Sequence, residues 1–101
     1  MSLSELSSRK AVLDAIAEYD RIGQVAFLKK YGFGCAREYF LDYDGHLYDS
    51  KAIAGVAHGY EFPKKGPLTS GDFSGGEATV RPKLEALGFT VRVQKRKSAR
   101  R

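Results

Sequence analysis

The sequence predicts a small single α+β domain, with about four helices and a short antiparallel sheet formed by a β-hairpin and a C-terminal strand. Two patterns point to this class. Apolar residues recur at helical spacing in segments that end at glycine, and they change to alternation around an Asp44-Gly45 turn. The 101 residues can bury one modest core, and a hydrophobic content of 43% is typical of a globular protein.

The first half of the chain favours two helices. After a flexible lead-in over residues 1–8, Ser8 is a suitable N-cap for a helix over 9–22, whose apolar positions are Val12, Leu13, Ile16, Tyr19 and Ile22. Gly23 ends this helix. A shorter one follows over 24–31, with an inward set (Val25, Phe27, Leu28) and an outward pair (Lys29, Lys30).

Three strands are predicted. Residues 38–43 alternate, with Tyr39, Leu41 and Tyr43 on one face. Asp44-Gly45 is a favoured two-residue hairpin turn, and 46–48 form the return strand. Residues 89–93 alternate again and give the last strand, so the hairpin and the chain end can share one sheet.

A helix over residues 50–60 is expected within the stretch YDSKAIAGVAHGY (48–60), because Asp49 and Ser50 are both good N-caps. Its core stripe would be Ile53, Val56, Ala57 and Tyr60. Lys51, Gly55 and His58 fall on the opposite side, which we expect to be exposed. That side is either an ordinary solvated face or a contact surface.

A last helix is predicted over 74–87, after a loop over 61–70 that carries Lys64-Lys65. Ser74 and Glu77 have the spacing of a capping box, and the core stripe would be Val80, Leu84 and Leu87. Pro82 should kink this helix or mark a restart. The turn Ser74-Gly75-Gly76 at its start suits a phosphate, although a tight turn that needs two glycines is the alternative.

The net charge of +5 belongs to the chain end. Residues 92–101 hold six basic and no acidic residues, which leaves eleven basic against twelve acidic residues in 1–91, a balance of −1. Residues 94–101 are therefore a basic tail that attracts phosphates or a solvated linker.

Several function classes are disfavoured. The single Cys35 excludes an intramolecular disulfide, and no Cys and His cluster has metal-site spacing. No apolar run approaches the roughly 20 residues of a membrane span, and no signal peptide is visible. We expect a cytoplasmic protein with no cofactor, no metal and no membrane partner. His46, His58 and Cys35 lack the partners of a catalytic centre, so we expect no catalysis by this domain.

Basic and aromatic residues near the two predicted helix starts suggest a nucleic-acid surface. The candidate DNA-binding residues are Arg37, Tyr48, Ser50, Lys51, Gly55, His58, Lys64, Lys65, Ser74, Gly75, Gly76, Arg81 and Lys83.

Four blocks of sequence resemble one family: AFLKKYGFG (26–34), YDSKAIAGVAHGY (48–60), PLTSGDFSGGEATV (67–80) and LEALGF (84–89). They are similar to the N-terminal head domain of ScoMcrA-like restriction endonucleases, over about residues 9–93. Such enzymes are modification-dependent (type IV) bacterial HNH nucleases, in which other domains cut DNA and recognise the modification. The resemblance implies no catalytic residue here.

The leading hypothesis is therefore a DNA-binding module that helps a restriction endonuclease engage modified duplex DNA. Phosphates would lie at Ser50-Lys51 and at Ser74-Gly75-Gly76. The alternative is a scaffolding or dimerisation domain that docks the other domains of the parent enzyme, with a possible homodimer.

Overall fold

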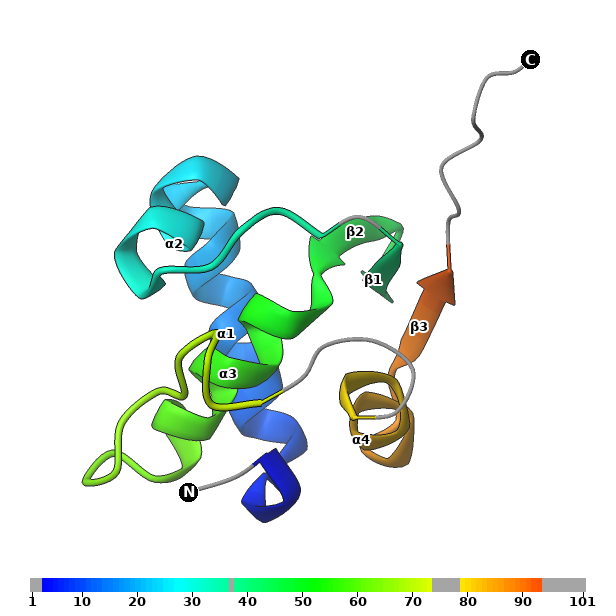
Figure 1. Ribbon diagram of the computed structural model, residues 1–101. Helices are drawn as coiled ribbons and strands as arrows, with labels where there is room; N and C mark the ends of the chain where they lie inside the picture. The colour runs from blue at the N-terminus through cyan, green and yellow to red at the C-terminus, as the bar shows by residue number, and fades with distance from the viewer. Residues whose placement is uncertain (1–2, 37, 74–78, 94–101) are drawn as a thin grey trace.

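The computed structural model describes residues 3–36, 38–73 and 79–93 (Figure 1). The described residues form four α-helices, one 3-10 helix and a three-stranded antiparallel sheet, which confirms the predicted α+β class. The elements are η1 (Leu3–Glu5), α1 (Arg9–Ile22), α2 (Gln24–Tyr31), β1 (Tyr39–Tyr43), β2 (His46–Asp49), α3 (Ser50–Glu61), α4 (Val80–Ala86) and β3 (Thr90–Val93).

Helix α3 is the centre of the fold (Figure 1). It contacts α1, α2, α4, η1 and the two hairpin strands. Every residue from 50 to 58 except Lys51 is buried, since these neighbouring elements cover the helix. Ile53 and Ala57 are fully buried, as the predicted core stripe requires.

Local signals fix the two N-terminal helices. The Ser8 side chain accepts a hydrogen bond from the Ala11 backbone N–H at 3.0 Å, which caps α1 as predicted. Gly23 has φ 89°, a left-handed conformation that favours glycine, and it separates α1 from α2. Phe27 and Leu28 are buried, and Lys29 and Lys30 are exposed as expected.

The sheet has the strand order β2-β1-β3. Leu41 lies in register with Tyr48 on β2 and with Val91 on β3, and all three side chains are buried. Asp44 and Gly45 have φ angles of 53° and 80°, the two positive values that a type I′ hairpin turn requires. The predicted hairpin and C-terminal strand are confirmed.

Helix α4 is shorter in the described residues than the predicted 74–87. It begins at Val80, and positions 74–78 lie outside the described residues. Pro82 is therefore in the first turn, where a backbone N–H has no partner within the helix, so it disturbs no hydrogen bond there. Val80 and Leu84 are buried, and Leu87 packs against the core.

Three predictions of burial were wrong. Leu3 and Leu6 are buried beneath the helices, so residues 3–8 are part of the fold rather than a flexible lead-in. Val25 is 79% exposed because it lies about 160° around α2 from Phe27, which faces the core. Tyr60 is 41% exposed because only its hydroxyl reaches inward, toward α1.

Candidate functional site

The predicted exposed face of Lys51, Gly55 and His58 is not exposed. Gly55 is buried under the loop that follows α3, and the Leu68 backbone N–H donates to the Gly55 carbonyl at 3.0 Å. A Cβ at position 55 would lie 2.7 Å from Phe33 Cζ and 3.0 Å from the Leu68 carbonyl oxygen. Glycine at this position thus permits loop packing, not an approach to a ligand.

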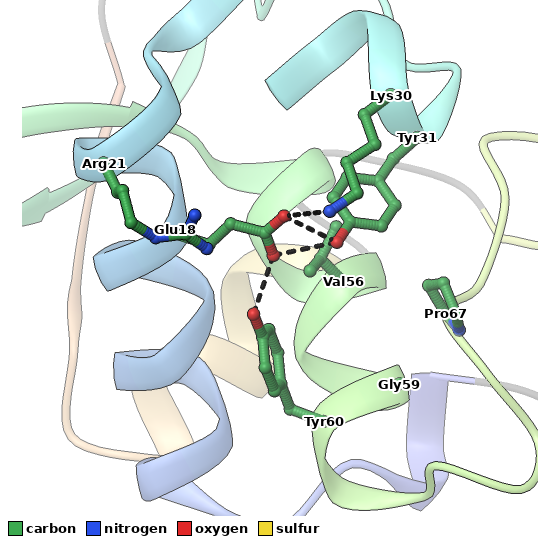
Figure 2. A pocket seen from close by; sticks show the side chains of 8 residues that line it. All are labelled: Glu18, Arg21, Lys30, Tyr31, Val56, Gly59, Tyr60 and Pro67. Atoms are coloured by element: carbon green, nitrogen blue, oxygen red, sulfur yellow. Dashed lines mark hydrogen bonds and ion pairs between the residues drawn. The ribbon is translucent and has the colours of Figure 1, made fainter. Parts of the chain in front are cut away.

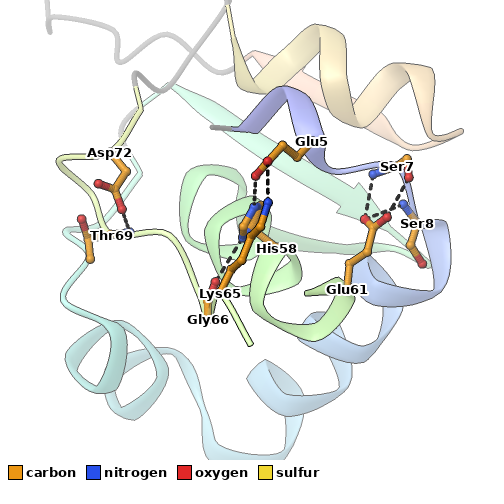
Figure 3. A network of polar contacts seen from close by, with 9 residues as sticks. All are labelled: Glu5, Ser7, Ser8, His58, Glu61, Lys65, Gly66, Thr69 and Asp72. Carbon is orange, nitrogen blue, oxygen red and sulfur yellow. Dashed lines mark hydrogen bonds and ion pairs between the residues drawn. The ribbon is translucent and has the colours of Figure 1, made fainter. Parts of the chain in front are cut away.

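His58 is fully buried and joins two distant segments (Figure 3). Its Nδ1 lies 3.1 Å from the Gly66 carbonyl oxygen, and its Nε2 lies 2.8 Å from Glu5 Oε1. Lys65 Nζ donates to Glu5 Oε2 at 2.8 Å. The prediction that His58 faces solvent was therefore wrong, and His58 holds η1 against the loop after α3.

The beginning of α3 is closed as well. The buried Asp49 carboxylate accepts hydrogen bonds from the Tyr19 hydroxyl at 2.5 Å, Gln24 Nε2 at 2.9 Å and the Ala36 backbone N–H at 2.7 Å. Ser50 Oγ donates to the Tyr39 carbonyl at 2.8 Å and is 2% exposed. The predicted phosphate position at this helix start is thus covered and already holds a carboxylate.

Tyr48 belongs to the same buried layer. It is 3% exposed, and its hydroxyl donates to Asp20 Oδ1 at 2.8 Å. Burial and this hydrogen bond raise the pKa of Tyr48 to about 12. Its predicted role on an aromatic ligand surface does not fit this burial.

Lys51 is only partly buried, unlike these neighbours. Its Nζ donates to the Ser70 carbonyl at 2.8 Å and lies 5.2 Å from the centroid of the Phe73 ring. Phe73 in turn packs against Phe33, with ring centroids 6.3 Å apart. The Lys51 ammonium therefore lies beside Phe73, the last described residue before the predicted Ser74-Gly75-Gly76 turn.

The other predicted cations are scattered. Lys64 is exposed, Lys65 is paired with Glu5, and Arg81 Nε lies 3.1 Å from Glu85 Oε2 one turn further along α4. Lys83 is half-buried on the same helix. The remaining predicted residues, Arg37, Ser74, Gly75 and Gly76, lie outside the described residues.

A polar cluster around Glu18 was not predicted (Figure 2). The Glu18 carboxylate is 2% exposed, and it accepts hydrogen bonds from Lys30 Nζ at 2.6 Å, from the Tyr31 hydroxyl at 2.8 Å and from the Tyr60 hydroxyl at 2.7 Å. Burial acts to raise the pKa of Glu18, but these hydrogen bonds outweigh it and lower that pKa. Burial and the bond to Glu18 raise the pKa of Tyr60 to about 12.

This cluster borders an open pocket of about 260 Å³ between α1, α2, α3 and the following loop, lined by Glu18, Arg21, Lys30, Tyr31, Val56, Gly59, Tyr60 and Pro67. One sequence signal pointed to it. Glu18 falls on the apolar stripe of α1, between Ala15 and Ile22, where an acidic residue needs buried partners.

The part of the chain that the structure describes lacks two kinds of feature. No group of three or more His, Cys, Asp or Glu residues there is arranged to hold a metal ion. None of its helices is both long and apolar enough to cross a membrane.

Comparisons with known proteins agree on one family. A family model described as the ScoMcrA-like N-terminal head domain matches residues 5–93. The solved structure of the type IV phosphorothioation-dependent restriction endonuclease ScoMcrA is 38% identical in sequence and superposes with a TM-score of 0.66. The match covers 90% of this chain but only 14% of that enzyme. A comparison with curated proteins found no match.

Proposed function

Since the chain belongs to the family of ScoMcrA-like N-terminal head domains, we propose that it is a non-catalytic DNA-binding module of a modification-dependent restriction endonuclease. Its partners would be modified duplex DNA and the other domains of the parent enzyme. Nuclease chemistry would belong to those other domains. A role on bacterial DNA implies a cytoplasmic location.

The position of Lys51 carries this proposal. A lysine in the first turn of a helix is unfavourable against the helix dipole, yet its ammonium is held on the Ser70 carbonyl and above Phe73. An ammonium has three N–H donors, and the Ser70 carbonyl takes one of them. The others can donate to an anion beside Phe73, and the glycine-rich sequence Ser74-Gly75-Gly76 that follows is of the kind that binds phosphate through backbone N–H groups.

The proposed contact set is narrower than the one predicted from sequence. Tyr48, Ser50, Gly55 and His58 are buried, so we assign them to the scaffold that positions the loop after α3. The remaining candidates are the basic and glycine-rich positions Arg37, Lys51, Lys64, Lys65, Ser74, Gly75, Gly76, Arg81 and Lys83. These groups suit phosphates, which give affinity without sequence selectivity.

The test compares Lys51→Ala with Lys10→Ala in the full chain. Lys10 is an exposed lysine on α1 that pairs with Asp14, so the control removes the same charge and leaves the basic tail intact. Binding to labelled duplexes, plain and phosphorothioated, is measured at several salt concentrations. We expect Lys51→Ala to weaken binding and to reduce the slope of log K against log salt by about one, and Lys10→Ala to change neither appreciably.

Equal behaviour of the two variants would refute the role of Lys51. Light scattering of the protein without DNA separates this proposal from the scaffolding alternative. A stable dimer that fails to bind any duplex would favour that alternative.

A further inference from the structure

The pocket beside Glu18 has the construction of a binding site rather than of a packing defect (Figure 2). Its acidic side is a buried carboxylate held by three donors from α2 and α3. Its opposite side is Pro67, which packs closely on α3: a Cβ at Gly59 would lie 2.6 Å from the Pro67 backbone nitrogen. The surrounding contacts therefore fix both sides of the pocket.

The lining combines flat apolar surface with both kinds of hydrogen-bonding group. The rings of Tyr31 and Tyr60, with Val56 and Pro67, supply the apolar part. The Lys30 ammonium and the Arg21 guanidinium can donate, and the tyrosine hydroxyls, which donate to Glu18, keep lone pairs that can accept. Such a lining suits a planar, neutral ligand that has donors and acceptors along one edge.

The size and charge of the pocket narrow the ligand further. Its volume of about 260 Å³ equals that of roughly nine water molecules at ~30 Å³ each, which suits a ligand of on the order of ten non-hydrogen atoms. Lys30, at 2.6 Å, neutralises the Glu18 carboxylate, and Arg21 leaves the lining with one net positive charge, which disfavours a cation and is compatible with a neutral base that carries its phosphate outside the pocket. A single heteroaromatic base meets each of these conditions.

We propose that this pocket binds one nucleobase turned out of the DNA, with Tyr60 as the stacking surface. This inference rests on the proposed DNA-binding function and adds a base contact to its phosphate contacts. Lys51 and Tyr60 lie near opposite ends of α3 and, at 100° per residue, on opposite sides of it. The base contact is therefore separate from the phosphate contact of Lys51 and is tested separately.

The first experiment uses no duplex. Free nucleosides, and separately inorganic phosphate, are titrated into the full isotope-labelled chain while backbone amide resonances are followed. We expect nucleosides to shift the resonances of Gly59, Tyr60 and Tyr31, and phosphate to leave them unchanged. Tyr60→Ala should weaken nucleoside binding by roughly 5- to 150-fold, the range of one base–aromatic stack, whereas Tyr60→Phe retains the ring and should retain binding. Leu47→Ala is the control, since Leu47 is 39% exposed on β2.

The second experiment uses a duplex that contains 2-aminopurine, whose fluorescence rises when it leaves the base stack. We expect the wild-type chain and Leu47→Ala to raise this fluorescence and Tyr60→Ala not to. If Tyr60→Ala does not fold, the wild-type resonance mapping alone decides the question.

The two proposals fail separately. Duplex binding with no rise in fluorescence and no nucleoside-induced shifts in the pocket would overturn the base site and leave the DNA-binding function standing. Shifts caused by phosphate and not by nucleosides would also overturn it. Nucleoside shifts in the pocket without any duplex binding would identify a site for free nucleosides, and would refute both the DNA-binding function and a base turned out of DNA.

Discussion

Replacing Gly55 with alanine tests whether this glycine serves packing or ligand contact. An alanine Cβ would lie 2.7 Å from Phe33 Cζ, 3.0 Å from the Leu68 carbonyl oxygen and 3.3 Å from Phe73 Cε1. The distance to Phe33 Cζ is too short for a van der Waals contact, and the Leu68 backbone is held by its hydrogen bond to the Gly55 carbonyl. Either the Phe33 ring or the loop must therefore move.

Two opposing effects set the size of the change. Alanine favours the helix over glycine by about 1 kcal/mol, and overpacking of a closed site costs about 1–3 kcal/mol. Because backbone as well as a ring opposes the new methyl group, we expect the packing cost to win by about 1–2 kcal/mol. For a domain of this size such a loss lowers Tm by roughly 5–15 °C.

Urea and thermal unfolding followed by circular dichroism measure this loss. Gly34→Ala is the matched control, because a Cβ at Gly34 meets nothing within 4 Å, so its stability should stay within about 0.5 kcal/mol of the wild type. A Gly55→Ala variant as stable as the wild type, or more stable by the helix-propensity gain, would refute this assignment of Gly55 to packing.

Three further predictions concern buried polar groups. His58→Ala should lower the free energy of unfolding, measured in urea, by about 2–4 kcal/mol, because it leaves a cavity and removes the ring that contacts Glu5 and the Gly66 carbonyl. Cys35→Ser, at an exposed position, is the control and should change that free energy little. Burial acts to raise the pKa values of Glu18 and Glu61, but the hydrogen bonds to Glu18 described above and those from Ser7 and Ser8 to Glu61 lower both below the ordinary 4.5. Their contribution to stability is complete above that pH and is lost as the pH falls through the lowered values, so Glu18→Gln should flatten the acid limb of a profile of unfolding free energy against pH. The pKa values of Tyr48 and Tyr60 are raised from 10 to about 12, so their contribution to stability is complete below pH 10 and is lost between pH 10 and 12. Tyrosinate absorbance with matched urea midpoints would detect this loss, and an unchanged midpoint over that range would contradict the hydrogen bonds of Tyr48 to Asp20 and of Tyr60 to Glu18.

Elements that begin or end at a helix cap or a tight turn were predictable from sequence. Ser8 and Gly23 bound α1, and the Asp44-Gly45 turn sets the hairpin, because the backbone angles and caps at these positions depend on neighbouring residues alone. The alternation of residues 89–93 likewise indicated β3, whereas its pairing with β1, which puts Val91 opposite the buried Leu41, was not predicted.

The environment of α3 was not predictable in the same way. Helical periodicity assumes one buried and one exposed face, but the loop after α3 covers Gly55, and Glu5 covers His58. Phe33 and Glu5 lie far from these residues in the chain, and no pattern in the sequence indicates that Phe33 contacts Gly55 or that Glu5 contacts His58. Burial of the polar face is a tertiary effect.

The Glu18 cluster was not predicted from sequence, for a related reason. Glu18 lies on the apolar stripe of α1, which is a sign of a buried carboxylate that was not used, and its donors Lys30, Tyr31 and Tyr60 come from two other helices. Tyr60 in particular satisfied the core pattern of its own helix, although its ring is half in solvent.

We propose that the folded domain binds DNA through its own surface, and not only through its tail. The most direct test measures duplex binding as a function of salt by the full chain in which the five basic residues at 95–101 are replaced with glutamine. We predict that this variant still binds duplex DNA at low salt and that log K for binding falls linearly with log salt concentration. Adding Lys51→Ala should weaken the binding further. Loss of all salt-dependent binding on neutralising the tail would contradict the account.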